Sequence, residues 1–239
     1  MKYNSFVPLI IGLITMVSCQ RELQLSHGDY TVLGEMTDHT PVYLFFEDKN
    51  GDTLIELNRK NTVSTTNWIY HVDKRLPLHL VIPKIINLQQ MREDNQMHKN
   101  EEAGNFYSYS DSTNQSLAFF PFKELKYTFN TYHSVKYATE FPEYHQHYRL
   151  YALTFLPGGE VVVNGTKVPF TELESFLSDF LAFEADGQRV MLYLNFHQGL
   201  TFDVYLKGVL LAIKLQQPGL EVSKTHFVFD PKILECDCY

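Results

Sequence analysis

Two periods of apolar residues divide the first half of this 239-residue chain into strands and a helix. In residues 41–46, 53–57 and 67–72, apolar and polar side chains alternate as they do along β-strands, and a turn rich in Asp, Asn and Gly joins the first two runs into a hairpin. Residues 78–88 place apolar side chains at helical spacing, with one proline that the first turns of a helix tolerate. These elements predict an N-terminal α+β unit over residues 41–88.

The middle of the chain changes composition twice. Residues 89–118 are dominated by Gln, Asn, Glu, Ser and Asp, which is typical of a polar linker or a long surface loop. Aromatic side chains return in residues 119–151, and their loose alternation indicates strands. The linker therefore separates the N-terminal unit from a C-terminal α+β domain, which we place at residues 119–239.

The last third of the chain has the clearest pattern. A Pro-Gly-Gly turn predicts a hairpin, and apolar stripes at helical spacing predict two helices, the first opened by a capping box at Thr171. The predicted elements are strands at 148–155 and 160–163, a helix at 171–181, a strand at 189–196, a helix at 202–213 and a strand at 225–229. This order predicts an α+β fold in which two helices pack on one face of an antiparallel or mixed sheet.

Residues 158–214 resemble the periplasmic domain of the ExbD/TolR family of biopolymer-transport proteins. The shared pattern comprises a tight turn at Asn164-Gly165, a lead from Val168 to Leu173 into the first helix, a buried strand and a second helix. The family's strand usually ends in Ala-Asp-x-x-x-Pro-Tyr, whereas residues 195–201 lack that acidic residue and proline. The resemblance implies this family's α+β fold for the C-terminal domain.

The N-terminal half contains the part of the family pattern that the C-terminal half lacks. In residues 69–88, Asp73 and Pro77 stand before an apolar helix as in the family's segment that leads from strand to helix. One interpretation is a degenerate duplication of an ExbD-like unit, whose first copy lacks the first helix. The resemblance makes Asp73 and Pro77 candidate binding residues.

The N-terminus has the features of a secretion signal. Its apolar run, residues 6–17, is too short for a spanning helix, which needs about 20 apolar residues. Met16 to Cys19 resembles the lipobox of bacterial lipoproteins, which implies a signal peptide at residues 1–18, a diacylglycerol on Cys19 and a tether at residues 19–40. An ordinary signal peptide that happens to contain a cysteine is the alternative.

Charge and cysteine content narrow the classes of function. The formal net charge is −8 and no cluster of Lys and Arg appears, which argues against nucleic acid as a partner. Besides Cys19, the chain has only Cys236 and Cys238, so it has neither a disulfide scaffold nor metal-site spacing. We expect no metal and no cofactor.

Few residues suggest catalysis. His145 and His147 would point to the same side of a strand and could hold zinc if a third ligand converged, but a polar, aromatic surface is the simpler interpretation. Asp73 could be a perturbed carboxylate, or a residue at a strand end that its neighbours stabilise. Trp68 is expected in the core or at its rim. The sequence therefore predicts no catalytic residue and a protein that is not an enzyme.

Together these features predict a protein of the bacterial envelope that binds partners without catalysis. The lipid on Cys19 would hold it on a membrane, facing the periplasm or the cell surface. The ExbD/TolR resemblance implies contacts with TonB-type or Tol-type envelope proteins, with cell-wall material or with a second copy. The alternative is a surface lipoprotein with hydrolytic or ligand-binding activity near His145 and His147.

Overall fold

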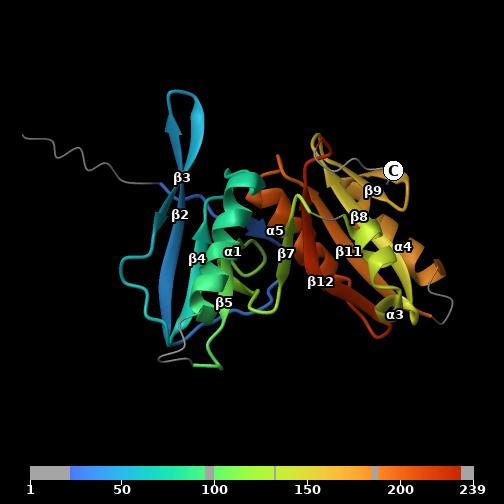
Figure 1. Ribbon diagram of the computed structural model, residues 1–239, viewed down its shortest axis with the longest axis horizontal. Helices are drawn as coiled ribbons and strands as arrows, with labels where there is room; N and C mark the ends of the chain where they lie inside the picture. The colour runs from blue at the N-terminus through green and yellow to red at the C-terminus, as the bar shows by residue number, and fades with distance from the viewer. Residues whose placement is uncertain (1–21, 95–99, 132, 185–187, 233–239) are drawn as a thin grey trace, which may run out of the picture.

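The computed structural model describes residues 22–94, 100–131, 133–184 and 188–232, which form two β-sheets with two helices between them (Figure 1). We call the part built on the first sheet the N-terminal lobe (residues 22–121) and the part built on the second sheet the C-terminal lobe (residues 126–232). The predicted α+β class is confirmed, because both sheets mix parallel and antiparallel pairs and both carry helices.

The N-terminal lobe is built on a six-stranded sheet. Its strands are β1 (His27–Gly28), β2 (His39–Lys49), β3 (Asp52–Asn58), β4 (Asn67–Val72), β5 (Asn105–Asp111) and β6 (Ser116–Pro121). β3 is antiparallel to β2, β4 is parallel to β2, β5 is parallel to β4, and β6 is antiparallel to β5. β1 pairs in parallel with the end of β5, beyond the residues that β4 pairs with.

The C-terminal lobe is built on a second six-stranded sheet, in the order β10-β9-β8-β11-β12-β7. Its strands are β7 (Lys126–Phe129), β8 (Tyr148–Leu156), β9 (Glu160–Val163), β10 (Thr166–Pro169), β11 (Arg189–His197) and β12 (Leu220–Phe229). β9 is antiparallel to β8 and to β10, whereas β11 is parallel to both β8 and β12. β7 pairs in parallel with the outer edge of β12.

The helices form where the apolar stripes predict them. They are α1 (Leu78–Asp94), α2 (Ser134–Glu140), α3 (Pro142–His145), a 3-10 turn η2 (Phe170–Glu172), α4 (Leu173–Glu184) and α5 (Phe202–Lys214). In α1, Pro83 is exposed while Val81, Ile82 and Ile85 are buried on one side. The predicted helices at 78–88, 171–181 and 202–213 are therefore confirmed, with small shifts at their ends.

The two lobes repeat one connectivity. The N-terminal lobe runs β2, β3, β4, α1, β5, and the C-terminal lobe runs β8, β9, β11, α5, β12. The neighbours are the same in both sheets, and so are the parallel and antiparallel relations between them. The lobes differ between the second and third strand, where the C-terminal lobe has β10 and α4 and the N-terminal lobe has only the turn of residues 59–66.

The core lies between the two sheets, where α1 and α5 fill the space (Figure 1). α1 contacts β7 and β12 of the C-terminal lobe, and α5 contacts β1 of the N-terminal lobe. Buried side chains of both lobes form one hydrophobic cluster, in which Tyr107 of β5 meets Phe202 of α5 edge to face at 5.1 Å. Separating the lobes would expose apolar surface on both helices, so burial of that surface stabilises their contact.

A second, small cluster lies on the opposite face of the C-terminal sheet. Met191 and Tyr193 of β11 and Phe227 of β12 are buried there, and Tyr137 of α2 packs against them. We expected residues 119–151 to be strands, but residues 134–145 form α2 and α3. That prediction is wrong for these residues because their aromatic side chains cover this sheet face at helical spacing instead of extending the sheet.

The segment expected to be a linker is largely structured. Within residues 89–118, α1 continues to Asp94, and β5 and the start of β6 follow; residues 95–99 lie outside the described residues. In β5, Tyr107 and Tyr109 are buried in the core, and the alternating residues on the other face include Ser108. The prediction of a linker is wrong because Ser108 and Ser110 lie on one face of β5 and Tyr107 and Tyr109 on the other. The serines make the segment polar overall, although its buried face is that of a core strand.

The segment expected to be a tether is also held against the fold from residue 22 onward. The hydroxyl of Tyr109 donates to the carbonyl of Tyr30 at 2.7 Å and accepts from the amide of Val32 at 3.0 Å. Gly28 in β1 lies so close to α5 that a Cβ there would be 2.7 Å from Leu210 Cδ1. The described part of residues 19–40 is therefore a part of the lobe contact and not a tether.

This close approach gives a stability test. We expect Gly28→Val to lower the free energy of unfolding by about 1–3 kcal/mol, because the added atoms would overlap with Leu210 and Tyr109. Gly34→Val is the matched control, since a Cβ at Gly34 meets only Thr31 Cγ2, at 3.9 Å. Urea unfolding of the two variants and the wild type measures the difference, and equal stability of the two variants would support a tether.

Candidate functional site

Two loops join the lobes, residues 74–79 after β4 and residues 198–203 after β11. Four backbone hydrogen bonds connect them: the amide of Leu78 to the carbonyl of Leu200 (2.8 Å), Phe202 to Leu76 (2.8 Å), His79 to Gln198 (2.9 Å) and Asp203 to Lys74 (3.1 Å). The bonds form two equivalent pairs: Leu78 to Leu200 in one direction corresponds to Phe202 to Leu76 in the other, and His79 to Gln198 corresponds to Asp203 to Lys74. The contact therefore has a local twofold axis.

Pro77 lies at this axis. It forms an isolated antiparallel bridge with Thr201, which holds the equivalent place in the other loop. The hydrogen bonds of this bridge are made by the residues on either side of Pro77 and Thr201, so the missing amide hydrogen of Pro77 leaves no bond unmade. The structure thus places this candidate binding residue in the contact between the lobes, where it is half-buried.

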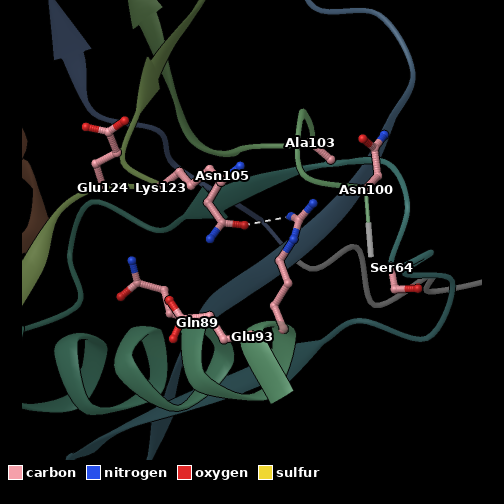
Figure 2. A pocket seen from close by; sticks show the side chains of 9 residues that line it. Ser64, Gln89, Glu93, Asn100, Ala103, Asn105, Lys123 and Glu124 are labelled. Carbon is pink, nitrogen blue, oxygen red and sulfur yellow. Dashed lines mark hydrogen bonds between the residues drawn. The ribbon is translucent and has the colours of Figure 1, made fainter. Parts of the chain in front are cut away.

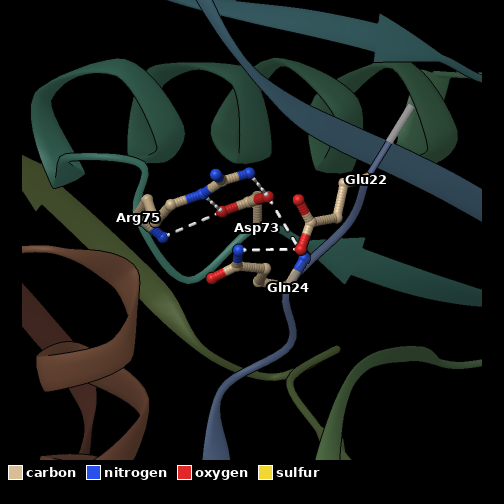
Figure 3. Close-up of polar contacts among 4 residues, drawn as sticks. All are labelled: Glu22, Gln24, Asp73 and Arg75. Carbon is tan, nitrogen blue, oxygen red and sulfur yellow. Dashed lines mark hydrogen bonds and ion pairs between the residues drawn. The ribbon is translucent and has the colours of Figure 1, made fainter. Parts of the chain in front are cut away.

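Asp73 lies at the end of β4 and is fully buried (Figure 3). Its carboxylate accepts hydrogen bonds from Arg75 Nε at 2.9 Å, from Arg75 Nη2 at 2.7 Å, from the Arg75 amide at 3.0 Å and from the Gln24 amide at 3.2 Å. Burial raises the pKa of Asp73, but these hydrogen bonds outweigh it and hold the pKa below its usual value. The interpretation of Asp73 as a strand-end residue stabilised by its neighbours is confirmed.

This arrangement gives Asp73 a structural role. A carboxylate has about four acceptor positions, and here four donors use them. In turn, the carbonyl of Gln24 accepts from the amide of Lys74 at 2.7 Å, which holds residues 22–24 beside the loop. Asp73 therefore has no lone pair free for proton transfer and connects the chain before β1 to the loop that joins the lobes.

His145 and His147 do not converge. His145 ends α3 and is buried, with Nδ1 2.6 Å from the carbonyl oxygen of Phe141 and Nε2 hydrogen-bonded to the Tyr193 hydroxyl. His147 lies in the turn before β8 and is exposed. The expectation that both would share one side of a strand is wrong, because a helix and a turn occupy these positions. Among the described residues, no group of three His, Cys, Asp or Glu could hold a metal ion.

A cavity of about 370 Å³ lies beside the end of α1, and Arg92 is one of its lining residues. Figure 2 shows Gln89, Glu93 and Asn105, which also line it. The Arg92 guanidinium donates to Asn105 Oδ1 at 2.7 Å, to the carbonyl of Gly104 at 3.0 Å and to the carbonyl of Thr66 at 2.7 Å. It also lies 4.8 Å from the ring of Trp68, which is buried as predicted. Since most of its donors are used, Arg92 ties β4, α1 and β5 together and is not a free anion site.

The outer edges of the two sheets differ in a way that bears on binding. Both edge hairpins, β2–β3 and β9–β10, turn through two residues of positive φ, Asn50-Gly51 and Asn164-Gly165. In such hairpins the residues beside the turn form a hydrogen-bonded pair, and the next residues direct their backbone groups outward. The register therefore directs the amides and carbonyls of Thr53, Ile55 and Leu57 to the free edge of β3.

The edge of β10 is protected, whereas that of β3 is not. By the same register, the residues directed outward from β10 are Lys167 and Pro169, the two residue types that most often guard an edge strand. No described strand pairs with the outer edge of β3, and Leu54 on that strand is 40% exposed. Figure 1 shows the β2–β3 hairpin projecting beyond the rest of its sheet. The edge of β3 is therefore open to an added strand.

A buried polar chain that the sequence did not predict lies at the centre of the molecule. The hydroxyls of Tyr107, Tyr127 and Tyr205 are linked in series at 2.8 and 3.1 Å, and the last is 2.9 Å from His226 Nδ1. These residues come from β5, β7, α5 and β12, so both lobes contribute. The sequence signal for this chain was weak: tyrosine and histidine, which carry hydrogen-bonding groups, occupy core positions of predicted elements, as Tyr205 and His226 do.

Comparisons of the chain with family models, with characterised proteins and with solved structures found no match. Within the described residues, no helix is long and apolar enough to cross a membrane. Cys19, Cys236 and Cys238 lie outside the described residues.

The buried histidine gives a prediction about pH. Burial lowers the pKa of His226 to about 3, so the folded protein keeps this ring neutral while the unfolded chain binds a proton below about pH 6.5. Stability is therefore lost as the pH falls from 6.5 towards the folded pKa, by up to about 2 kcal/mol between about pH 7 and pH 5. Burial also lowers the pKa of His71 and of His133 to about 4, which adds to the same trend.

Urea unfolding of the wild type and of His226→Gln at both pH values tests this. We expect the loss of stability on acidification to be smaller in the variant, because it removes one of the groups that titrate only in the unfolded chain. The contribution of Asp73 is separate, since its pKa is lowered and its stabilisation is lost only below its ordinary value of 3.8. An equal loss in both proteins would show that His226 titrates in the folded state as it does in water.

Proposed function

We propose that this chain is a non-enzymatic binding protein of the bacterial envelope, related to ExbD/TolR transport components, and that it binds a partner protein by strand addition. The observation that carries the proposal is the open edge of β3, where Thr53, Ile55 and Leu57 direct backbone groups outward. An extended segment of a partner could pair with this edge through main-chain hydrogen bonds.

The repeated connectivity supports the relation to ExbD/TolR through duplication. Both lobes have two antiparallel strands, then a parallel strand, a helix and another parallel strand. The loops that follow the third strand in each lobe meet about a local twofold axis, as two copies of one unit would. Leu173 and Leu177 of α4 belong to the same buried cluster as α5, which favours two helices on one face of the C-terminal sheet.

The geometry favours β3 over the other surfaces that the sequence suggested. The carboxylate of Asp73 is buried with its acceptor positions used, and Pro77 pairs with Thr201, so neither residue offers a free binding group. On β3, the exposed side chain of Leu54 presents an apolar group on the outer face of the hairpin. An apolar segment, of the kind a TonB-type or Tol-type envelope protein could present, fits this edge best.

The hydrolytic alternative has less support. It needs His145, His147 and a third ligand in one pocket, whereas His145 is bonded to Phe141 and Tyr193 and His147 is exposed. Because both ring nitrogens of His145 are used, a metal ion that bound either one would have to displace its hydrogen bond.

Site-directed cross-linking in cells tests strand addition. A photo-crosslinking residue at Leu54 should give a product with another envelope protein, and one at Lys167 on the protected edge should not. Thr53→Pro removes one outward amide from β3 and should reduce the Leu54 product several-fold, while Lys167→Pro, the matched change on β10, should leave it unchanged.

Mass spectrometry of the product identifies what pairs with β3. A product of two copies of this chain would contradict a different protein as partner. Equal products from both positions, or a Leu54 product that Thr53→Pro does not reduce, would contradict strand addition. Circular dichroism of both proline variants checks that each sheet still forms.

The proposed anchor has its own test. Cys19→Ser removes the sulfur that would carry the diacylglycerol, so we expect the protein to leave the membrane fraction and to lose incorporation of labelled fatty acid. Ultracentrifugation of lysates measures the distribution, and Cys236→Ser is a control with the same change of atoms at the other end of the chain. A variant that still sediments with membranes and carries label would contradict a lipid on Cys19.

A further inference from the structure

An open cavity of about 470 Å³ lies where the two lobes meet beside α5. We call it the seam cavity. Phe106 and Phe120 from the N-terminal lobe and Val209, Ile213 and Val222 from the C-terminal lobe line its walls. Neither lobe alone has these walls, so the cavity exists only because the lobes join. Its size and its place between two lobes are typical of small-molecule sites.

The polar groups of the seam cavity come from both lobes. The uncharged ones include Asn105, Gln216, Ser223 and His226. Charged side chains also line the cavity, two acidic (Glu102, Glu124) and two basic (Lys123, Lys224), and Lys224 forms an ion pair with Glu124. The cavity therefore combines an apolar wall with uncharged hydrogen-bonding groups and with charges of both signs that balance each other.

His226 is the deepest of these polar groups, with 1% of its surface exposed. It ends the buried chain of Tyr107, Tyr127 and Tyr205. In one direction of this chain, Tyr107 donates to Tyr127, Tyr127 donates to Tyr205, and Tyr205 donates to His226 Nδ1. Each hydroxyl hydrogen then has an acceptor. The reverse direction would leave the Tyr107 hydroxyl hydrogen without an acceptor, which is costly in the core. The chain thus favours the tautomer in which His226 carries its hydrogen on Nε2.

The second ring nitrogen is available to a ligand. The hydrogen bond of the His226 ring is made by Nδ1, no hydrogen bond of Nε2 occurs among the described residues, and the ring lines the seam cavity. A neutral imidazole in an apolar cavity is a good donor to an uncharged oxygen, whereas a carboxylate would lose its hydration without gaining a buried cation.

We propose that the seam cavity binds an uncharged, largely apolar small molecule whose carbonyl oxygen accepts a hydrogen bond from His226 Nε2. The apolar body of the ligand replaces water against the aromatic and aliphatic walls. Both lobes contact the ligand, so its binding also stabilises their association. This site is separate from the edge of β3 and does not depend on strand addition there.

Nile red is a suitable probe because it is uncharged and apolar, carries a carbonyl acceptor and changes its emission with the polarity around it. We expect saturable binding to the wild-type protein with a blue-shifted emission. Ile213→Trp should weaken binding at least tenfold by filling the cavity. Leu211→Trp, the matched change on the other flank of α5 beside Phe170, should bind like the wild type.

His226→Phe separates the hydrogen bond from the apolar contacts. It keeps a ring of similar size but removes the donor, so we expect about a five- to tenfold loss of affinity, the effect of one net hydrogen bond. Urea unfolding checks that this variant is folded, and Ile213→Trp tests the cavity independently.

Absence of saturable binding by the wild type would overturn the site, as would equal binding by the two tryptophan variants. An unchanged affinity of folded His226→Phe would overturn the role of His226.

Discussion

The structure depends on the backbone contact between two loops, residues 74–79 and 198–203. Their paired hydrogen bonds place α1 and α5 side by side between the sheets, and each helix then contacts strands of the other lobe. Asp73 supports this arrangement from one side, because its buried carboxylate holds both the start of the loop and the segment before β1. The apolar surface that the helices bury follows from this contact, so both lobes share one core.

Joining the lobes through their helices decides which surfaces remain for binding. The loop with Asp73 and Pro77 is used inside the molecule, and so are the inner faces of both sheets. The edges of the two hairpins stay outside this contact and are unequal: Lys167 and Pro169 guard β10, whereas Thr53, Ile55 and Leu57 leave β3 open. An edge without such protection normally aggregates unless a partner or a neighbouring segment covers it, which is why the difference bears on function.

The lobe contact also explains why polar side chains occur in the core. Tyr107, Tyr127 and Tyr205 would each cost free energy if buried alone, but in series each hydroxyl has a partner. The series ends at His226, whose Nε2 has no partner among the described residues and lies beside the seam cavity. This nitrogen is the donor that the proposed ligand would use, while the tyrosine hydroxyls of the series already have partners.

The apolar period of the sequence was enough to predict the elements in which that period is local: the hairpin of β2 and β3, the helices α1, α4 and α5, and the α+β class. It did not reveal β5, because the serines beside Tyr107 and Tyr109 face away from the core and make the segment look like a linker. Three further features follow from the packing of the folded chain: residues 22–33 pack as part of the lobe contact, Pro77 meets Thr201, and His226 ends a chain of tyrosines. Periodicity reports which face of one element is buried, whereas the partner of that face is set by contacts between residues far apart in the chain.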